Sequence, residues 1–366
     1  MRMEFKKICV VGTGLIGASL ILSFKRKGIG TLIRGVDRAD VLEKALSSGL
    51  VDEAFEPAEA AQVFKDSDLI LLAVTIEQIL EYLPLVAECA APGTVVTDVG
   101  STKARIVALS RQLFGNGRHF IGGHPMAGSE KSGIDAADPY LFENCFYILT
   151  PLPDTPNQVV ETLASTLQLI GSKVLIMDEE THDRIAAAVS HLPQILAVCL
   201  VNFVEKYNRE QPNYLKLAAG GFRDMTRIAS SPFDLWQDIC KTNSQNIIEH
   251  LDDLIHELVE FKEYFYGDEL RHQFERAART RLSIPKDTKG FLNPNYDISL
   301  VVEDKPGIIA AIATALASEN INIRDIEVLK VRLLEGGTLR LSFETEQQRT
   351  QAVKLLSDKG FLARKI

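Results

Sequence analysis

The chain has 366 residues, 46% of them hydrophobic, and this length predicts two or three domains rather than a single core. Its 40 basic and 49 acidic residues give a formal net charge of −9, which argues against a nucleic acid or an anionic membrane as the main partner. The five cysteines are scattered and form no C-x-x-C pair, so no disulfide framework and no metal site is expected, and a reducing cytoplasm is the expected location.

Residues 1–177 are typical of an α/β domain of the Rossmann type, with a doubly wound parallel sheet. Short β-rich runs alternate there with helical patterns. The first run, Ile8 to Val11, is too short for a signal sequence or a membrane span and leads directly into glycines, so it is interpreted as the first strand. The other expected strands are 31–36, 69–74, 95–99, 120–122, 146–150 and 173–176.

Residues 178–285 are predicted to be all helical, because strand signals vanish and long helical patterns take their place. One pattern repeats apolar residues at three- and four-residue spacing, at Ile247, Leu251, Leu254, Ile255, Leu258 and Phe261. We interpret this stripe first as core and second as a subunit interface. A homodimer formed through this domain is expected, since symmetric dimers dominate among soluble oligomers.

A linker and a small separate module are expected after the helices. Residues 286–294 continue a stretch with proline, glycine and charges but no periodicity, which is typical of a linker. Residues 295–366 follow the order βαββαβ of a ferredoxin-like unit. The expected strands are 295–302, 321–331, 338–343 and 362–366, and a turn at Glu335-Gly336-Gly337 joins the second to the third. One expected helix begins after Pro306-Gly307, with Ile308, Ile309, Ile312, Ala313 and Leu316 on one face. The other covers 347–357.

A dinucleotide site is the strongest chemical signal. The motif G-x-G-x-x-G follows the first strand and opens a helix, as Gly12, Thr13, Gly14, Leu15, Ile16 and Gly17. The glycines allow a tight turn, close approach of the pyrophosphate and close packing of helix on strand, while the helix amino terminus offers N–H groups to the phosphates. Asp37 lies twenty residues after Gly17, where a carboxylate binds the ribose hydroxyls of NAD and repels the extra phosphate of NADP.

Two alternatives accompany this site. Arg38 follows Asp37 and has the charge to attract the NADP phosphate, although its planar side chain suits covering the adenine ring. A glycine-rich turn in an α/β domain that binds no nucleotide would also carry the motif. On the strength of the carboxylate, NAD is the expected cofactor.

His124 is the candidate general base, in the run G-G-H-P-M-A-G-S-E over residues 122–130. A histidine titrates near neutral pH and can take a hydroxyl proton while hydride leaves the adjoining carbon. The alternative is a loop histidine between turn glycines. Ser101 follows the strand 95–99, where open sheets place ligand-facing residues, so its hydroxyl is expected to orient the imidazole or the nicotinamide, or else to cap the next helix.

The helical region adds candidate substrate ligands. Ser190 and Gln194 lie one helical turn apart and suit a polar, uncharged part of a substrate, with His191 offset from them. Buried side chains satisfied by backbone carbonyls are the alternative. Arg223 and Arg227 follow a glycine pair, and one of the two is expected to bind a substrate carboxylate in bidentate fashion.

The motifs G-T-G-L-I-G, D-V-G-S-T-K, G-G-H-P-M-A-G-S-E, S-H-L-P-Q and G-G-F-R-D-M-T-R, in this order over residues 5–290, resemble the prephenate/arogenate dehydrogenase family. The tail, with D-K-P-G-I-I and E-N-I-N-I, resembles an ACT domain, a regulatory module that often binds amino acids. The resemblance implies NAD-dependent oxidative decarboxylation of prephenate to 4-hydroxyphenylpyruvate, for tyrosine biosynthesis, without a metal. It implies His124 as proton acceptor aided by Ser101, Arg227 as the carboxylate ligand, and Ser190 and Gln194 facing the substrate.

The resemblance leaves alternatives open. Gln194 lacks the charge to balance the ammonium of arogenate, so prephenate is expected and arogenate is the alternative substrate. More remote alternatives are a β-hydroxyacid dehydrogenase, a class that uses a lysine as proton acceptor, and a non-catalytic sensor of NAD and amino acids. The ACT module is expected to bind tyrosine or another aromatic amino acid near Gly307 and Asn320, giving feedback control, or else only to add dimer contacts.

Overall fold

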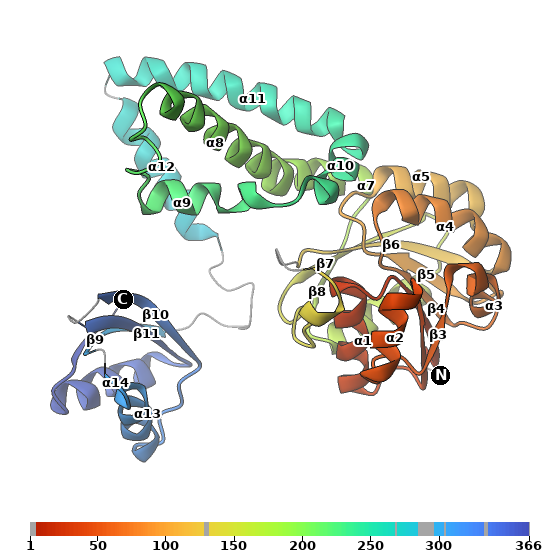
Figure 1. Cartoon of the computed structure of the whole chain (residues 1–366), viewed down its shortest axis with the longest axis horizontal. Helices are drawn as coiled ribbons and strands as arrows, with labels where there is room; N and C mark the ends of the chain where they lie inside the picture. The colour runs from red at the N-terminus through yellow and green to blue at the C-terminus, as the bar shows by residue number, and fades with distance from the viewer. Residues whose placement is uncertain are drawn as a thin grey trace. The chain divides into compact units, whose positions relative to one another are not determined.

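The structure is a computed structural model that describes residues 5–127, 132–267, 269–284, 296–303, 305–332 and 336–365 (Figure 1). The chain divides into two compact units, Met1–Arg281 and Leu282–Ile366. The predicted linker, residues 286–294, lies outside the described part of the chain, as do residues 128–130 of the histidine motif.

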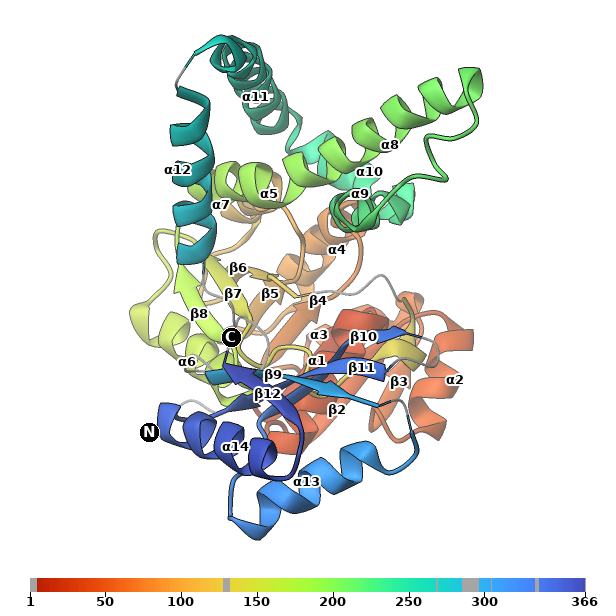
Figure 2. The ribbon, with the colours of Figure 1, turned by 90° about the vertical axis from the view of Figure 1, so that its left-hand side faces the viewer.

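The first unit is built on a sheet whose eight described strands lie in the order β3-β2-β1-β4-β5-β6-β7-β8, and Figure 2 shows this order from β8 on the left to β3 on the right. Every neighbouring pair is parallel except β6 and β7, which are antiparallel. The strands are β1 (Lys7–Val11), β2 (Leu32–Val36), β3 (Glu53–Phe55), β4 (Leu69–Leu72), β5 (Val95–Asp98), β6 (His119–Pro125), β7 (Phe146–Pro151) and β8 (Lys173–Ile176).

Helices cover both faces of this sheet, which confirms the predicted doubly wound α/β class. One apolar cluster joins the strands to α1 and α6, and a second joins them to α3, α4 and α5. Helix α1 ends at Gly28, whose φ of 67° closes the helix, with three basic residues in its last turn where they complement the helix dipole. The helices are α1 (Leu15–Lys27), α2 (Ala39–Ser47), α3 (Ala60–Phe64), α4 (Ile76–Cys89), α5 (Ala104–Leu113) and α6 (Asn157–Leu169).

Strand β6 is longer than predicted and contains His124 itself. A Cβ on Gly122 would lie 2.1 Å from Oγ1 of Thr150, and one on Gly123 would lie 2.4 Å from the carbonyl oxygen of Asp98. Both glycines are therefore required by close strand packing rather than by a turn, and His124 lies in a paired strand opposite Ile148. The interpretation of His124 as a residue between turn glycines is thus wrong.

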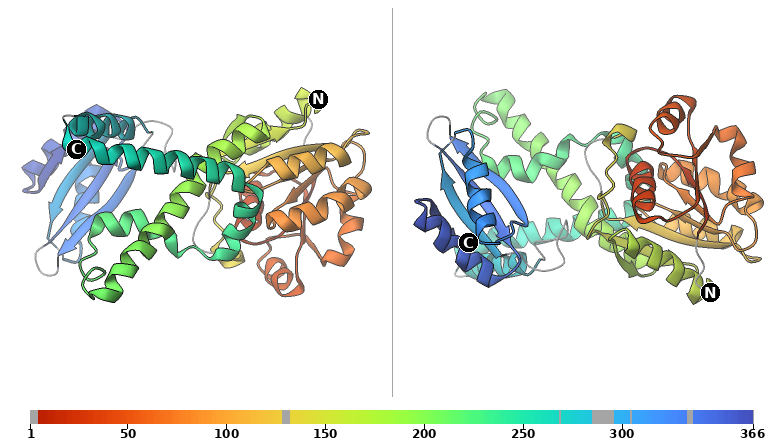
Figure 3. Two further views of the ribbon diagram at one scale, coloured as in Figure 1. Left: turned by 90° about the horizontal axis from the view of Figure 1, so that it is seen from above. Right: turned by 90° about the horizontal axis from the view of Figure 1, so that it is seen from below.

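The rest of the first unit is helical, as predicted. A continuous helical segment, Glu179–Glu210, consists of α7, the π-helical turn η3 and α8. By length and composition alone this segment could cross a membrane. The mean hydropathy of its most apolar window is 1.7, and 22% of that window is buried. Helices α8 and α11 extend away from the sheet (Figure 3). The elements are α7 (Glu179–Ala186), η3 (Ala187–His191), α8 (Leu192–Glu210), α9 (Gly220–Thr226), η4 (Arg227–Ser230), α10 (Phe233–Thr242), α11 (Ser244–Glu263) and α12 (Glu269–Ser283).

The apolar stripe predicted for residues 247–261 is present on α11, but a single chain does not bury it. Ile247 is buried, whereas Ile255 and Leu258 are 50% and 57% exposed. Phe203 on α8 and Phe274 on α12 are also exposed. The expectation that this stripe is first of all core is therefore wrong, and these helices present an uncovered apolar surface.

The second unit has the predicted βαββαβ order. Its described strands form an antiparallel sheet, β10-β11-β9-β12, packed on two helices through residues such as Leu300, Ile312 and Leu341. Two predictions are wrong: the second strand begins at Asp325 rather than at residue 321, and Ile309 is 45% exposed rather than on the buried face. The elements are β9 (Tyr296–Val302), α13 (Ile308–Ser318), β10 (Asp325–Arg332), β11 (Gly336–Phe343), α14 (Glu346–Asp358) and β12 (Leu362–Lys365).

Candidate active site

The glycine motif forms a tight turn between β1 and α1. Gly12 has a φ of +88°, and a Cβ on Gly17 would lie 1.9 Å from the carbonyl oxygen of Gly12, so both positions need glycine for the fold. A Cβ on Gly14 would meet no protein atom within 4 Å, and its φ of −74° is open to any residue. The absence of a side chain at Gly14 therefore leaves space for a group outside the chain, at the amino terminus of α1, which begins with Leu15 and Ile16.

Asp37 ties the end of β2 to this turn. Its carboxylate accepts hydrogen bonds from the N–H and the hydroxyl of Thr13, at 2.7 and 3.0 Å, and from the N–H of Arg38 at 2.8 Å. Thr13 is fully buried, whereas the Arg38 side chain is exposed and lies 3.5 Å from Asp40. The carboxylate is therefore fixed beside the glycine turn, and Oδ1, which accepts one hydrogen bond, has further acceptor capacity for a ribose hydroxyl.

A buried ion pair lies between β5 and β6, beneath the candidate base. Lys103 and Asp98 are both fully buried and form an ion pair through Nζ and Oδ2. Lys103 Nζ also donates to the carbonyl oxygen of Gly123 at 2.7 Å. Burial lowers the pKa of Lys103, while the neighbouring charge of Asp98 opposes that shift. This pair fixes the strand that carries His124 against the loop that carries Ser101.

His124 is itself buried, with 8% of its surface exposed, and its Nδ1 lies 2.8 Å from Nε2 of His182. The two rings meet edge to face, at 71°. Burial holds the pKa of His124 well below its ordinary value, and the neighbouring His182, Lys103 and His191 act in the same direction. The ring is therefore neutral at physiological pH, which is the state that accepts a proton.

His182 in turn contacts Asp183, and both residues were missed by the sequence analysis. Nδ1 of His182 lies 2.8 Å from Oδ1 of Asp183. The Asp183 carboxylate also accepts the N–H groups of Lys103 and Ala104, at 2.7 and 2.9 Å, which are the first free donors of α5. A carboxylate that is remote in the sequence thus caps the amino terminus of α5.

The start of α11 and the end of α10 dock on the nucleotide-binding region. The Asn243 amide donates to the carbonyl oxygen of Asp183 at 2.7 Å and lies 3.2 Å from Nδ1 of His191. The hydroxyls of Thr102 and Thr242 lie 2.7 Å apart. The bond between Thr102 and Thr242 joins the helical part to the loop after β5, and the contacts of Asn243 join the start of α11 to α7 and η3.

The predicted substrate ligands lie on this helical part. Gln194 is buried, and its amide donates to the carbonyl oxygen of Ile228 at 3.0 Å, which fixes α8 against η4, the turn that begins with Arg227. His191 is buried and meets the ring of Trp236 edge to face, with centroids 6.0 Å apart. Ser190 is half-buried in η3. Helix α8 and η4 thus bring Gln194 next to the turn of Arg227, while His191 belongs to the packing around Asn243 and Trp236.

Ser101 is half-buried between β5 and α5. The side chain that the structure brings to Nδ1 of His124 is that of His182, and the α5 cap is Asp183. His182 and Asp183 thus take two of the positions expected for the Ser101 hydroxyl, at Nδ1 of His124 and at the amino terminus of α5. A role beside the nicotinamide remains the prediction for Ser101.

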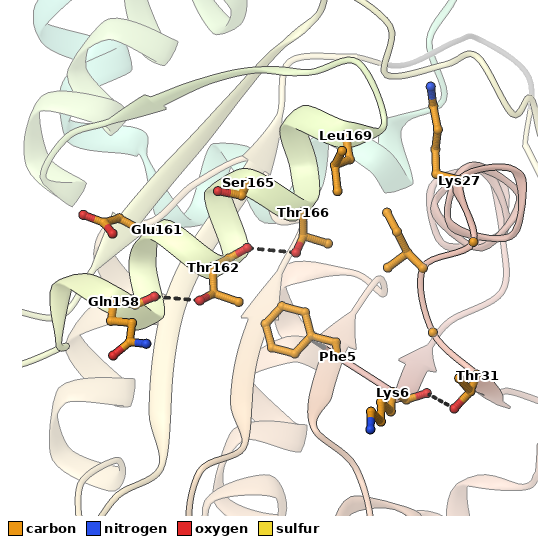
Figure 4. Close-up of a pocket in the computed structure, with 13 residues that line it drawn as sticks. Phe5, Lys6, Lys27, Thr31, Gln158, Glu161, Thr162, Ser165, Thr166 and Leu169 are labelled. Carbon is orange, nitrogen blue, oxygen red and sulfur yellow. Dashed lines mark hydrogen bonds between the residues drawn. The ribbon is translucent and has the colours of Figure 1, made fainter. Parts of the chain in front are cut away.

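A groove of about 660 Å³ lies elsewhere, between α6 and the residues around β1 and the end of α1 (Figure 4). It opens at the amino end of β1, whereas ligands of doubly wound sheets bind at the carboxyl ends of the strands. The hydroxyls of Thr162 and Thr166 bond to carbonyl oxygens of their own helix, and that of Thr31 to the carbonyl of Lys6. These three hydroxyl groups already have partners within the chain, and we do not interpret this groove as the active site.

Most of the chain is similar to known proteins. Family models described as prephenate dehydrogenase, nucleotide-binding domain, prephenate dehydrogenase, dimerization domain, and ACT domain match residues 20–176, 178–278 and 296–354. Prephenate dehydrogenase of Bacillus subtilis (strain 168) is 36% identical over 94% of this chain and 94% of the relative. The structure of A. aeolicus prephenate dehydrogenase in complex with hydroxyphenyl propionate and NAD+ has a TM-score of 0.73 and 28% identity, covering 78% of this chain and 100% of that one. Synechocystis arogenate dehydrogenase has a TM-score of 0.68 and 31% identity, covering 76% and 99%.

Proposed function

The chain belongs to the prephenate dehydrogenase family, and we propose that it catalyses the NAD-dependent oxidative decarboxylation of prephenate to 4-hydroxyphenylpyruvate, in tyrosine biosynthesis. The observation that carries this proposal is the neutral, buried His124, held through Nδ1 at the carboxyl end of the sheet. The open space at Gly14 and the carboxylate of Asp37 fit NAD. When bound, NAD accepts the hydride from the ring carbon that bears the hydroxyl group.

His124 takes the hydroxyl proton as the hydride leaves, so that the ring carbon becomes a carbonyl. The bond to the ring carboxylate then breaks, and its electron pair moves into the ring, which becomes aromatic as carbon dioxide leaves. The oxygen on the ring recovers a proton from His124 and becomes the phenolic hydroxyl. Substrate, NAD and products balance without net release of a proton, and aromatisation drives the second step.

Arg227 and Gln194 are the proposed substrate ligands. Arg227 begins η4, and its guanidinium suits bidentate binding of a substrate carboxylate. Ser190 and His191 precede Gln194 on the same helical segment. Gln194 carries no charge to balance the ammonium of arogenate, which favours prephenate. Arogenate is the alternative, because one structural relative is named arogenate dehydrogenase.

For the second unit, we propose feedback control by an aromatic amino acid such as tyrosine. Gly307 and Asn320 both have positive φ, of 88° and 56°, and lie at opposite ends of the eleven-residue helix α13. A helix of this length spans roughly 16 Å, so one small effector cannot touch both positions within one chain. We therefore assign the effector to the Gly307 end, where the turn before α13 exposes backbone groups.

A homodimer is proposed from the uncovered apolar surface of α8, α11 and α12. The region includes residues 178–278, which match a model described as a dimerization domain. The same surface accounts for the apolar character of the segment 179–210 without a membrane. A substitution of Leu258 by glutamate is expected to yield monomers in light scattering, and an unchanged dimer would contradict this interface. The cytoplasm is the proposed compartment, because none of the five cysteines, all of which the structure describes, forms a disulfide.

The function is tested by NADH formation with prephenate and, separately, with arogenate, each with NAD and with NADP. Faster turnover of prephenate with NAD supports the proposal. Faster turnover of arogenate would retain the family and reject the role of Gln194, and no turnover of either would reject the function. Removing residues after Gly290 is expected to leave catalysis and abolish inhibition by tyrosine, whereas unchanged inhibition would move the effector site to the first unit.

A further inference from the structure

His124, His182 and Asp183 form a buried chain of hydrogen bonds with a defined direction. The carboxylate of Asp183 only accepts, so the proton between Asp183 and His182 lies on Nδ1 of His182. Nε2 of a neutral His182 is then an acceptor, and Nδ1 of His124 must donate to it. This assignment leaves Nε2 of His124 without a proton. It is the tautomer that a general base requires.

We propose that His182 is a positioning residue, which fixes His124 in its Nε2-basic tautomer and stabilises the imidazolium that forms during turnover. This inference rests on the proposed function, and it follows from the proton balance given above. Because the phenolic oxygen recovers its proton, the base must hold that proton and return it. His182 is suited to this task. When His124 becomes an imidazolium, the hydrogen bond from its Nδ1 to Nε2 of His182 becomes stronger, while Nδ1 of His182 remains bonded to Asp183.

The surroundings hold the three members of this chain in place. The charged groups near His124 are Lys103 and Asp98 beneath β6 and Asp183 on α7, and His182 and His191 are the other titratable groups that face it. Lys103 is neutralised by Asp98, and Asp183 is held by two N–H groups of α5. His182 and Asp183 are both about 1% exposed, so water does not compete for their hydrogen bonds.

The test compares two substitutions of His182 in the full chain. His182→Leu removes the acceptor, while His182→Gln offers an amide oxygen close to the position of Nε2. We expect the leucine variant to lose kcat by about 100-fold or more with little change in KM for prephenate or in NAD affinity, and the glutamine variant to recover at least about tenfold of that loss. In the pH profile of kcat/KM, the pH at which the value falls on the acid side should differ between the leucine variant and the wild type. His119→Gln, at the far end of β6, is the matched control and should behave as wild type.

A second measurement is independent of activity. Nitrogen-15 NMR of the His124 ring reports which nitrogen carries the proton. We expect a protonated Nδ1 in the wild type and in His182→Gln, and a mixture of tautomers in His182→Leu. The proposal is overturned if Nε2 is protonated in the wild type, or if the glutamine variant is no more active than the leucine variant while both bind NAD. A wild-type enzyme inactive on prephenate would reject the proposed function, yet the NMR result would still decide the tautomer.

Discussion

The backbone N–H of Gly123 donates a 3.0 Å hydrogen bond to Oδ1 of Asp98, in the interior of the first unit. The second carboxylate oxygen of Asp98 accepts the N–H of Gly100 at 2.8 Å and pairs with Lys103. One buried carboxylate therefore joins β6, the strand that contains His124, to the loop that contains Ser101. The spacing of these two segments depends on an ion pair that is fully removed from water.

Breaking that pair should destabilise the protein. Lys103→Met leaves the Asp98 carboxylate buried with no cation, and removing one partner of a buried pair costs roughly 3–5 kcal/mol. Urea unfolding measures the change. The matched control is Lys44→Met, which removes the exposed pair with Asp135 and should cost less than about 1 kcal/mol. Equal losses of unfolding free energy in the two variants would show that the buried pair contributes no more to stability than the exposed one.

Two glycines of the same turn should respond in opposite ways to alanine. Gly14→Ala meets no protein atom, so its stability should equal that of the wild type while NAD affinity falls. Gly17→Ala places a Cβ 1.9 Å from a backbone oxygen and should lower stability by about 3 kcal/mol. Thermal unfolding and nucleotide titration separate the two effects. An NAD affinity in Gly14→Ala equal to that of the wild type would show that the cofactor does not bind at this turn.

Asp37→Asn should change cofactor preference. The substitution removes a charge-assisted bond to the ribose and the repulsion of a phosphate, so NAD should bind roughly 10- to 100-fold more weakly and NADP more tightly. Thr13→Val is the control, because it removes one bond to Asp37 and leaves the carboxylate in place. Its ratio of NAD to NADP affinity should match the wild type. An unchanged ratio in Asp37→Asn would contradict the role assigned to the carboxylate.

His124→Asn should lower kcat by at least about 100-fold, because the amide cannot take the hydroxyl proton. NAD affinity should be unchanged, since His124 does not contribute to the nucleotide turn. Steady-state rates and a nucleotide titration check the two statements together. A variant that retains most of its activity would exclude His124 as the base.

Stability should fall as the pH drops from about 6.5 to 5. Burial lowers the pKa of His191 to about 4 and that of His124 well below its ordinary value, so the unfolded chain binds protons in this range that the folded chain does not. Protonation of the unfolded chain at His191 alone then removes about 2 kcal/mol of stability between pH 7 and pH 5, and His124 acts in the same direction. Urea unfolding at pH 7 and pH 5 measures the loss. His191→Gln should reduce the loss by about 2 kcal/mol, and a loss equal to that of the wild type would assign the effect to other groups.

Much of the fold follows from local patterns in the sequence. The buried β-rich runs and the glycine motif are short-range signals, and they predicted seven strands of the first sheet and the order of the second unit. Strand β3 was missed because Glu53–Phe55 is three residues long and none of them is fully buried. The direction of β7 could not be read either, since parallel and antiparallel pairing give the same alternation in so short a strand.

The site was only partly predictable for a different reason. His182 and Asp183 lie in an ordinary helical pattern, and their role depends on contacts with residues 58 and 80 positions away. The pair of adjacent histidine and aspartate, one helical turn after the cap at Asp178, was the available signal. The exposed apolar stripe of α11 shows a related limit. An apolar stripe has the same helical period whether it packs against its own chain or against a second chain, so its period could not distinguish the two.

The residues that assemble the base come from two regions of the chain, and one region is synthesised before the other. His124 and the nucleotide turn lie within the first 177 residues, whereas the histidine that sets the tautomer of His124 and the carboxylate that caps α5 come from α7. An emerging chain therefore acquires the means to hold a dinucleotide before it acquires a competent base. In the proposed mechanism, reactivity toward substrate therefore requires the helical segment, because α7 supplies both His182 and Asp183.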